Sequence, residues 1–160
     1  MDRYRRDPPP TGKEDRTDVD HSSESTRSAV QLFLTRFGEG DPERTAELFA
    51  ETVDWMIVGD PAVVPWVRAR STRADAAAHF RELGENVIQA DGSPAVDGVL
   101  ADGRDAVVTG VLNATIRTTG LPFRTPFALR LTVEDGLLTR FHLYEDSLAV
   151  ARAVQPPAGG

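Results

Sequence analysis

The sequence predicts a single α+β domain over residues 25–154, in which helices pack on a curved antiparallel sheet around a single pocket. Two observations support this prediction. Apolar residues recur at helical spacing in the first half of the chain, and valine- and threonine-rich segments bounded by turn residues fill the second half. Helices that precede the strands, instead of alternating with them, indicate an α+β arrangement. A length of 160 residues suits one domain.

Three helices are expected before the strand-rich half. The first covers residues 25–38, because large apolar residues recur three and four positions apart within it. The second covers 41–49 and opens with an aspartate cap, a proline at the first helical position and an acidic first turn. The third begins at Thr72, which is spaced from Asp75 as in a capping box, and ends at Gly84.

Four strands and a last helix are expected in the remainder of the domain. A first strand lies at 53–59, directly after the second helix. The other strands cover 106–118, 127–133 and 137–145, with a hairpin turn between the last two. A short helix at 147–154 closes the domain. The three later strands form an antiparallel meander.

The two ends of the chain are expected to lie outside the packed domain. Residues 1–24 are polar and include three consecutive prolines, so they cannot bury enough apolar surface to order themselves. We predict a disordered tail over residues 1–24 and a frayed C-terminus over 155–160.

Composition excludes several classes of function. A net charge of −7 argues against binding to nucleic acid or to an anionic membrane, and no stretch is apolar enough to span a bilayer. Without cysteine, the chain has no disulfide, thiolate nucleophile or cysteine-bound metal, which fits a cytoplasmic location. Its three histidines lack metal-ligand spacing. We therefore expect no metal, no cofactor and no phosphate-binding loop.

The order of these elements resembles the nuclear transport factor 2-like superfamily, in particular its SnoaL-like branch. The segments that carry the resemblance are Phe-Gly-Glu-Gly-Asp at 37–41, Leu-Phe-Ala-Glu-Thr-Val-Asp-Trp at 48–55, Gly-Asp-Pro at 59–61 with Pro-Trp at 65–66, and Val-Glu-Asp-Gly-Leu-Leu at 133–138 leading to Tyr-Glu-Asp-Ser at 144–147. The resemblance implies a cone-shaped barrel and a homodimer joined through open sheet faces. It leaves function open, because this fold hosts isomerases, cyclases, dehydratases, epoxide hydrolases and non-catalytic binders.

Asp146 is the leading candidate for a catalytic base. It follows the last strand, where the resemblance to SnoaL-like cyclases implies a catalytic aspartate, and we expect it to share a sheet face with Tyr144 and His142. A carboxylate at the dry end of a pocket would have a raised pKa, suited to removing a proton next to a carbonyl. The alternative is that Asp146 only caps the last helix, together with Ser147.

Two known catalytic sites of this fold are incomplete here. The epoxide-hydrolase triad would need an arginine and an aspartate near positions 111 and 113, which hold Val111 and Asn113. The ketosteroid isomerase base would lie near Met56, where no acid stands. Asn113 could still donate a hydrogen bond to a substrate oxygen, or it could be satisfied within the sheet.

Four further residues are candidates for the pocket. His79 and His142 could act as an acid or a base, or could be ordinary half-exposed histidines. Trp55 and Trp66 could form aromatic walls for a flat hydrophobic ligand, although core packing explains Trp55 equally well.

We therefore predict a cofactor-independent enzyme that isomerises, cyclises or dehydrates a polyketide- or terpenoid-like molecule. Asp146 would be the base, and Asn113, Tyr144 or a histidine would stabilise the enolate. The first alternative is a non-catalytic module for small-molecule binding or dimerisation. The second is an epoxide hydrolase with an incomplete triad.

Overall fold

The computed structural model describes residues 14–158, which form four α-helices, one short 3-10 helix and six strands. The helices are α1 (Glu14–Glu39), α2 (Pro42–Ala46), η1 (Pro65–Val67), α3 (Arg73–Asn86) and α4 (Ser147–Val154). The strands are β1 (Phe49–Ile57), β2 (Val87–Gln89), β3 (Ala95–Asp102), β4 (Asp105–Ile116), β5 (Pro122–Glu134) and β6 (Leu137–Glu145). The predicted α+β class is confirmed.

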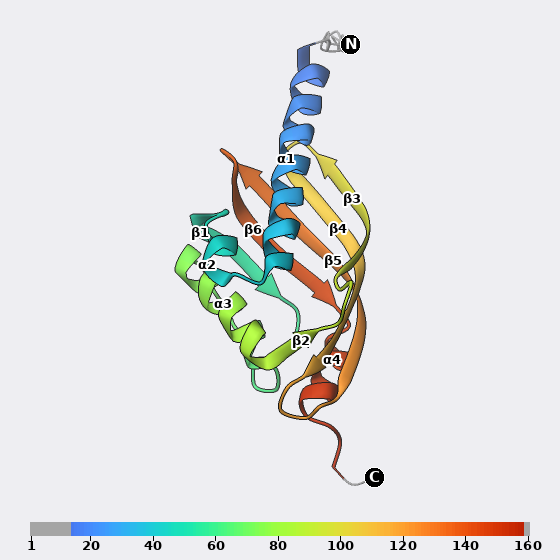
Figure 1. The fold of residues 1–160 in the computed structure, drawn as a ribbon. Coiled ribbons are helices and arrows are strands. Elements are labelled where there is room, and N and C mark those ends of the chain that lie inside the picture. Colours follow the sequence, from blue (N-terminus) through green and yellow to red (C-terminus); the bar gives the residue numbers. More distant parts are fainter. Residues whose placement is uncertain (1–13, 159–160) are drawn as a thin grey trace, which may run out of the picture.

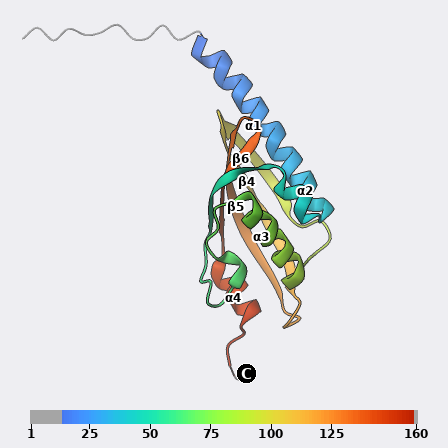
Figure 2. The same ribbon diagram turned by 90° about the vertical axis from the view of Figure 1, so that its left-hand side faces the viewer.

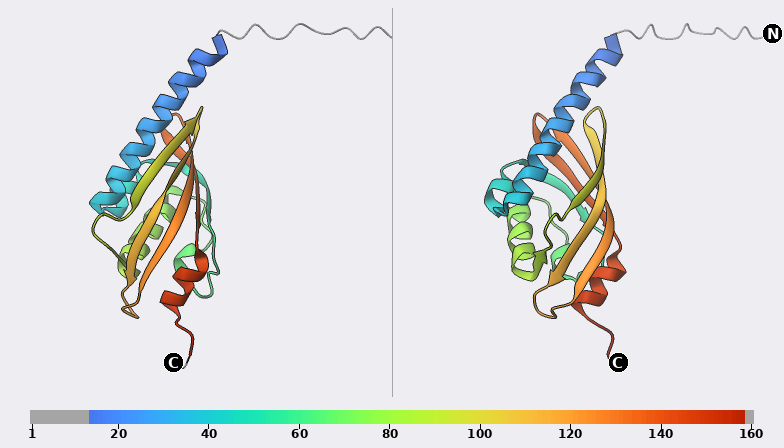
Figure 3. Two further views of the ribbon diagram at one scale, coloured as in Figure 1. Left: turned by 90° about the vertical axis from the view of Figure 1, so that its right-hand side faces the viewer. Right: turned by 45° about the vertical axis from the view of Figure 1, so that its right-hand side comes forward.

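The strands form one strongly curved sheet in the order β1-β6-β5-β4-β2, and β3 also pairs with β4. Figure 1 shows α1, α2 and α3 on one side of this sheet, and the turned views in Figures 2 and 3 show that its other face carries no helix in the described part of the chain. The antiparallel meander predicted for the three later strands is present as β4, β5 and β6; β2 and β3 also pair with β4 antiparallel, whereas β1 pairs with β6 in parallel. We call the uncovered side the open sheet face.

Helix α1 begins at Glu14, well before the start predicted at residue 25. Residues 14–24 contain neither glycine nor proline, so nothing in their backbone chemistry stops a helix. This segment lacks the apolar periodicity on which the helix prediction relied, because it extends beyond the end of the sheet (Figure 1). Two hydrogen bonds join α1 to the turn before β4. The Gly103 backbone N–H donates to the Ser23 hydroxyl at 2.9 Å, and the Thr26 hydroxyl donates to the Gly103 carbonyl oxygen at 2.7 Å. Residues 1–13 of the predicted tail lie outside the described part.

The second helix is shorter than predicted, and β1 starts where that helix was expected to end. Asp41 caps α2 by accepting a hydrogen bond from the Arg44 backbone N–H at 3.1 Å. Phe49 was assigned to the helix by its apolar character, but it is the first residue of β1 and is fully buried. The strands β2 and β3 were not predicted.

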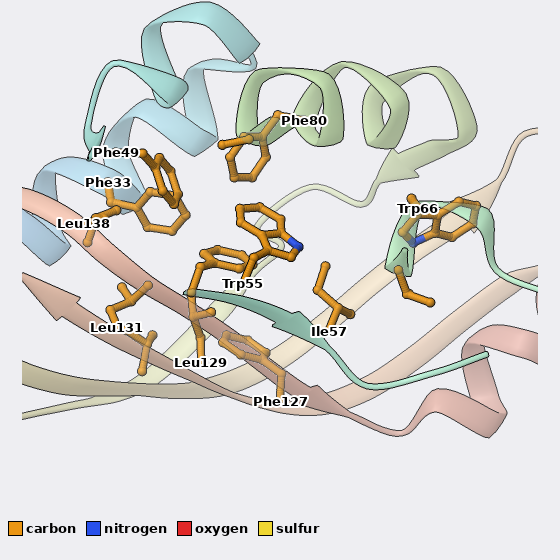
Figure 4. Close-up of a cluster of buried hydrophobic side chains, with 14 of the residues drawn as sticks. Phe33, Phe49, Trp55, Ile57, Trp66, Phe80, Phe127, Leu129, Leu131 and Leu138 are labelled. Carbon is orange, nitrogen blue, oxygen red and sulfur yellow. The ribbon is translucent and has the colours of Figure 1, made fainter. Parts of the chain in front are cut away.

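An aromatic cluster fills the space between the helices and the sheet (Figure 4). Trp55 of β1 stacks on Phe141 of β6, with ring centroids 4.2 Å apart and planes inclined by 16°. Phe33 of α1 and Phe80 of α3 contact this pair from the helical side. Each large aromatic side chain buries on the order of 150–250 Å², so this cluster supplies much of the driving force that holds the helices on the sheet.

No helix within residues 14–158 is long and apolar enough to cross a membrane.

Candidate active site

A cavity of about 90 Å³ lies between the inner sheet face and helices α1, α3 and α4. Its walls are almost entirely apolar, and the polar side chains among its lining residues are His79, Gln89 and Glu145. Aromatic rings contributed by several elements surround these three: Phe33, Phe37, Trp66, Phe80, Phe123, Phe127 and Phe141. A dry cavity with a few convergent polar groups is the usual form of a small-molecule site.

Glu145 supplies the carboxyl group of this cavity. It is the last residue of β6 and shares the inner face with Phe141 and Leu143, two and four residues earlier. Burial, together with the smaller effect of the negative charge on neighbouring Asp146, raises the pKa of the Glu145 carboxyl from the ordinary 4.5 to about 7. At neutral pH this group therefore exists in both its acid and its base form, which general acid–base catalysis requires.

The sequence contained a signal for Glu145 that our prediction did not use. Side chains on a strand alternate between its two faces. Phe141 and Leu143 are apolar residues two positions apart in the second half of the last strand, so the residue two positions on belongs with them on the buried face. A carboxylate that continues an apolar alternation was the feature to look for.

His79 is the second polar group, and it is held in one protonation state. Its side chain is buried at 3% exposure in α3, and Nδ1 lies 3.1 Å from the backbone carbonyl oxygen of Trp66. Burial, together with the smaller effect of the positive charge on Arg70, lowers the pKa of His79 from the ordinary 6.5 to about 3. The ring is therefore neutral at physiological pH. Because a carbonyl oxygen can only accept, its single proton lies on Nδ1.

The loop that carries Trp66 is fixed on both sides of the tryptophan. Gly59 adopts φ +143°, a conformation that side chains rarely allow, and a Cβ there would approach Val67 within 3.3 Å. Farther along, Arg70 is buried and donates to Glu82 of α3 at 2.6 Å. Trp66 is 5% exposed and lines the cavity.

The structure does not bring Asp146 into the cavity. Its side chain is exposed, and Oδ1 accepts a hydrogen bond from the Ala149 backbone N–H at 3.1 Å. Asp146 therefore caps α4, which is the alternative role that the sequence allowed. The Thr125 hydroxyl also accepts from the backbone N–H of Asp146 at 2.8 Å, which fixes the start of α4.

Three other predicted site residues belong to the open sheet face. Tyr144 is 47% exposed, and His142 contacts Asp54 with 2.9 Å between Nε2 and Oδ1. That contact with His142 holds the pKa of the Asp54 carboxyl below its usual range. Asn113 is opposite Arg124 in the β4–β5 register, and its neighbour Leu112 lines the cavity instead. None of the three contacts the cavity.

Trp55 lies in the core rather than in the cavity wall. It is 8% exposed and packs against Phe141 and His79, with its ring centroid 4.9 Å from that of His79. Its Nε1 atom has no hydrogen-bond partner among the described residues. A buried indole N–H usually has a hydrogen-bond partner, so the unpaired Nε1 of Trp55 is unusual.

Within residues 14–158, no group of three or more histidine, aspartate or glutamate side chains is arranged to hold a metal ion.

Comparisons with solved structures support the same fold. An NTF2-like protein from Burkholderia xenovorans has 25% sequence identity and a TM-score of 0.73, covering 83% of this chain and 98% of its own. A protein from Xanthomonas campestris, provisionally named a polyketide cyclase, has 18% identity and a TM-score of 0.67, covering 84% and 99%. A protein from Kribbella flavida, provisionally named a ketosteroid isomerase, has 24% identity and a TM-score of 0.57, covering 86% of both chains.

No curated protein sequence matches this chain. The family model described as SnoaL-like domain, however, matches residues 30–141, which is more than half of the sequence. The resemblance seen in the sequence is thereby confirmed: the chain belongs to the SnoaL-like domain family within the NTF2-like fold.

Proposed function

We propose that this protein is a cofactor-independent enzyme that moves a proton on a hydrophobic small molecule, with Glu145 as the general base. The observation that carries the proposal is the carboxyl group of Glu145 in an otherwise apolar cavity, with a pKa of about 7. The names of two structural neighbours, an isomerase and a polyketide cyclase, agree with this class of reaction. Glu145 replaces Asp146 as the base because Asp146 is exposed and caps a helix.

The chemistry follows from the environment of the carboxylate. An oxygen of ionised Glu145 takes a proton from carbon next to a carbonyl, and the electron pair of the broken C–H bond forms an enolate. Return of the same proton to another carbon gives isomerisation. Attack of the enolate carbon on a second carbonyl gives aldol cyclisation. A carboxylate with little solvent around it is a stronger base than one in water, which favours the first step.

Two alternatives fit the cavity less well. Epoxide hydrolysis by an acid–arginine–acid triad lacks its arginine, since the lining residues include none within the described part of the chain. A pure binding module would have no use for a carboxylate whose burial is costly. It would also retain all its properties when that carboxylate is replaced by an amide.

The test is exchange of the acidic C–H protons of 2-tetralone, a flat bicyclic ketone, in D₂O. General-base catalysis accelerates such reactions by about a hundredfold or more. Exchange by Glu145→Gln should therefore be slower than exchange by the wild type by at least that factor. Asp146→Asn is the matched control because it changes the adjacent carboxyl group and keeps the helix cap. It should retain exchange within a few-fold. Exchange by Glu145→Gln at the wild-type rate would refute Glu145 as the base, and no catalysed exchange by the wild type would leave the binding module as the better account.

A further inference from the structure

One ring nitrogen of His79, a residue that lines the candidate active site, makes no hydrogen bond within the described residues. Its side chain lines the cavity at 3% exposure, and its hydrogen bond within the described residues is the one from Nδ1–H to the Trp66 carbonyl oxygen. With the proton on Nδ1, Nε2 of the neutral ring presents a lone pair and no hydrogen. An acceptor that has no partner in the protein is suited to a hydrogen-bond donor that arrives with the ligand.

A second unpaired polar atom belongs to the residue packed against His79. The Trp55 ring centroid is 4.9 Å from that of His79, and Nε1 of Trp55 is buried without a partner in residues 14–158. Figure 4 shows this nitrogen on the side of the ring that faces Trp66 and Ile57, both of which line the cavity. One acceptor and one donor therefore occur on neighbouring rings at the same end of the core.

The charges around the cavity restrict the ligand group further. A cationic donor would approach the guanidinium groups of Arg68 and Arg70, whose positive charges act on His79. An anionic group would share the cavity with the Glu145 carboxylate and lie near Asp146. A ketone or an ether offers no hydrogen to Nε2. A hydroxyl is a neutral group that can donate to Nε2 and can also accept from an indole N–H.

We propose that His79 is a specificity-determining residue that selects ligands bearing a neutral hydroxyl group, which donates its hydrogen to Nε2. The inference rests on the proposed function in that it assigns part of the same cavity. The substrate class is thereby narrowed to flat hydrophobic molecules with a phenolic, enolic or alcoholic hydroxyl.

The experiment compares two isosteric probes, 2-naphthol and 2-methylnaphthalene, which differ in a hydroxyl and a methyl group. One hydrogen bond to a buried acceptor corresponds to about a five- to tenfold preference for 2-naphthol by the wild type, measured by fluorescence titration at pH 7. His79→Phe keeps an aromatic ring and loses the acceptor, so the preference should fall to within about twofold. Glu145→Gln should keep the preference although it loses proton exchange, which separates this inference from the proposed function.

Several results would overturn the inference. They are equal affinity of the wild type for the two probes, no binding of 2-naphthol, or an unchanged preference in folded His79→Phe. Should His79→Phe fail to fold, ¹⁵N NMR of the wild-type histidine gives the answer. The Nε2 resonance of His79 should be unprotonated in the free protein and should shift with 2-naphthol but not with 2-methylnaphthalene. A protonated Nε2, or equal shifts with both probes, would refute the assignment.

Discussion

Replacing Glu145 by glutamine should make the protein more stable at pH 8 and change its stability little at pH 5. The folded state raises the pKa of this carboxyl to about 7 from the ordinary 4.5, chiefly through burial. At a pH between 4.5 and about 7, Glu145 is protonated in the folded protein and ionised in the unfolded chain. The free energy of unfolding therefore falls as the pH rises through this window. Glutamine does not ionise, so the variant escapes this loss.

The magnitude follows from the width of the window. Each pH unit over which only the folded state is protonated lowers the free energy of unfolding by about 1.4 kcal/mol. Over the span from 4.5 to about 7, the loss comes to about 3 kcal/mol at its largest. Most of it falls between pH 5 and 8, so the stability of Glu145→Gln relative to wild type should rise by about 2–3 kcal/mol across that range.

Urea denaturation of both proteins at each pH measures this difference. Subtracting the wild-type value from that of the variant removes the titration of groups that the two proteins share. Asp146→Asn is an informative control, because losing the neighbouring negative charge lowers the pKa of Glu145 and narrows the pH window. A difference between Glu145→Gln and wild type that is constant from pH 5 to 8 would refute the reasoning, since it would mean that the carboxyl is well solvated.

Three further predictions concern the fold and its assembly. Phe49→Ala should cost about 3–5 kcal/mol in urea denaturation, because Phe49 is fully buried among aromatic rings; Phe49→Leu keeps more volume and should cost less. Asp146→Ala should cost about 1 kcal/mol through loss of the α4 cap, whereas Asp146→Asn should retain it, and equal stability of the two variants would contradict this. The homodimer remains a prediction. Leu100 on β3 is 73% exposed. The wild type should sediment as a dimer, and Leu100→Lys should sediment as a monomer.

The sequence was sufficient for the fold because the relevant signals are local. Phe33 and Phe37 recur at helical spacing, and Thr72 with Asp75 forms the predicted capping box at the start of α3. The Glu134-Asp135-Gly136 turn needs a left-handed backbone at Asp135 and Gly136, which such residues supply. These features depend on neighbours in the chain and can be read without a structure.

Elements that depend on distant partners were missed. β2 and β3 are stabilised by pairing with β4, and their own residues are weak strand signals. Gly98 adjoins a register shift in β3, and Val96 and Leu100 are exposed, so no apolar alternation marks that strand. The early start of α1 was missed for the same reason, since its first turns bury no regular apolar face.

The candidate site was missed by one residue. Our prediction followed the parity of His142, Tyr144 and Asp146, which continues onto the open sheet face. Neighbouring positions of a strand lie on opposite faces. Shifting the proposed base from Asp146 to Glu145 therefore moves it from the solvent-exposed side to the cavity. His79 and Trp66, which the sequence suggested for the pocket, both line the cavity, but the hydrogen bond between them joins a helix to a loop and cannot be inferred from spacing.

The most direct test of the account is the pH dependence of 2-tetralone proton exchange by the wild-type protein. If Glu145 is the base, the catalysed rate should rise with pH and level off with a midpoint of about 7, the pKa of that carboxyl. Glu145→Gln should show no such titration. A midpoint near the ordinary 4.5 of a solvated glutamate, or the same profile in Glu145→Gln, would contradict the assignment of Glu145 as the base in this cavity.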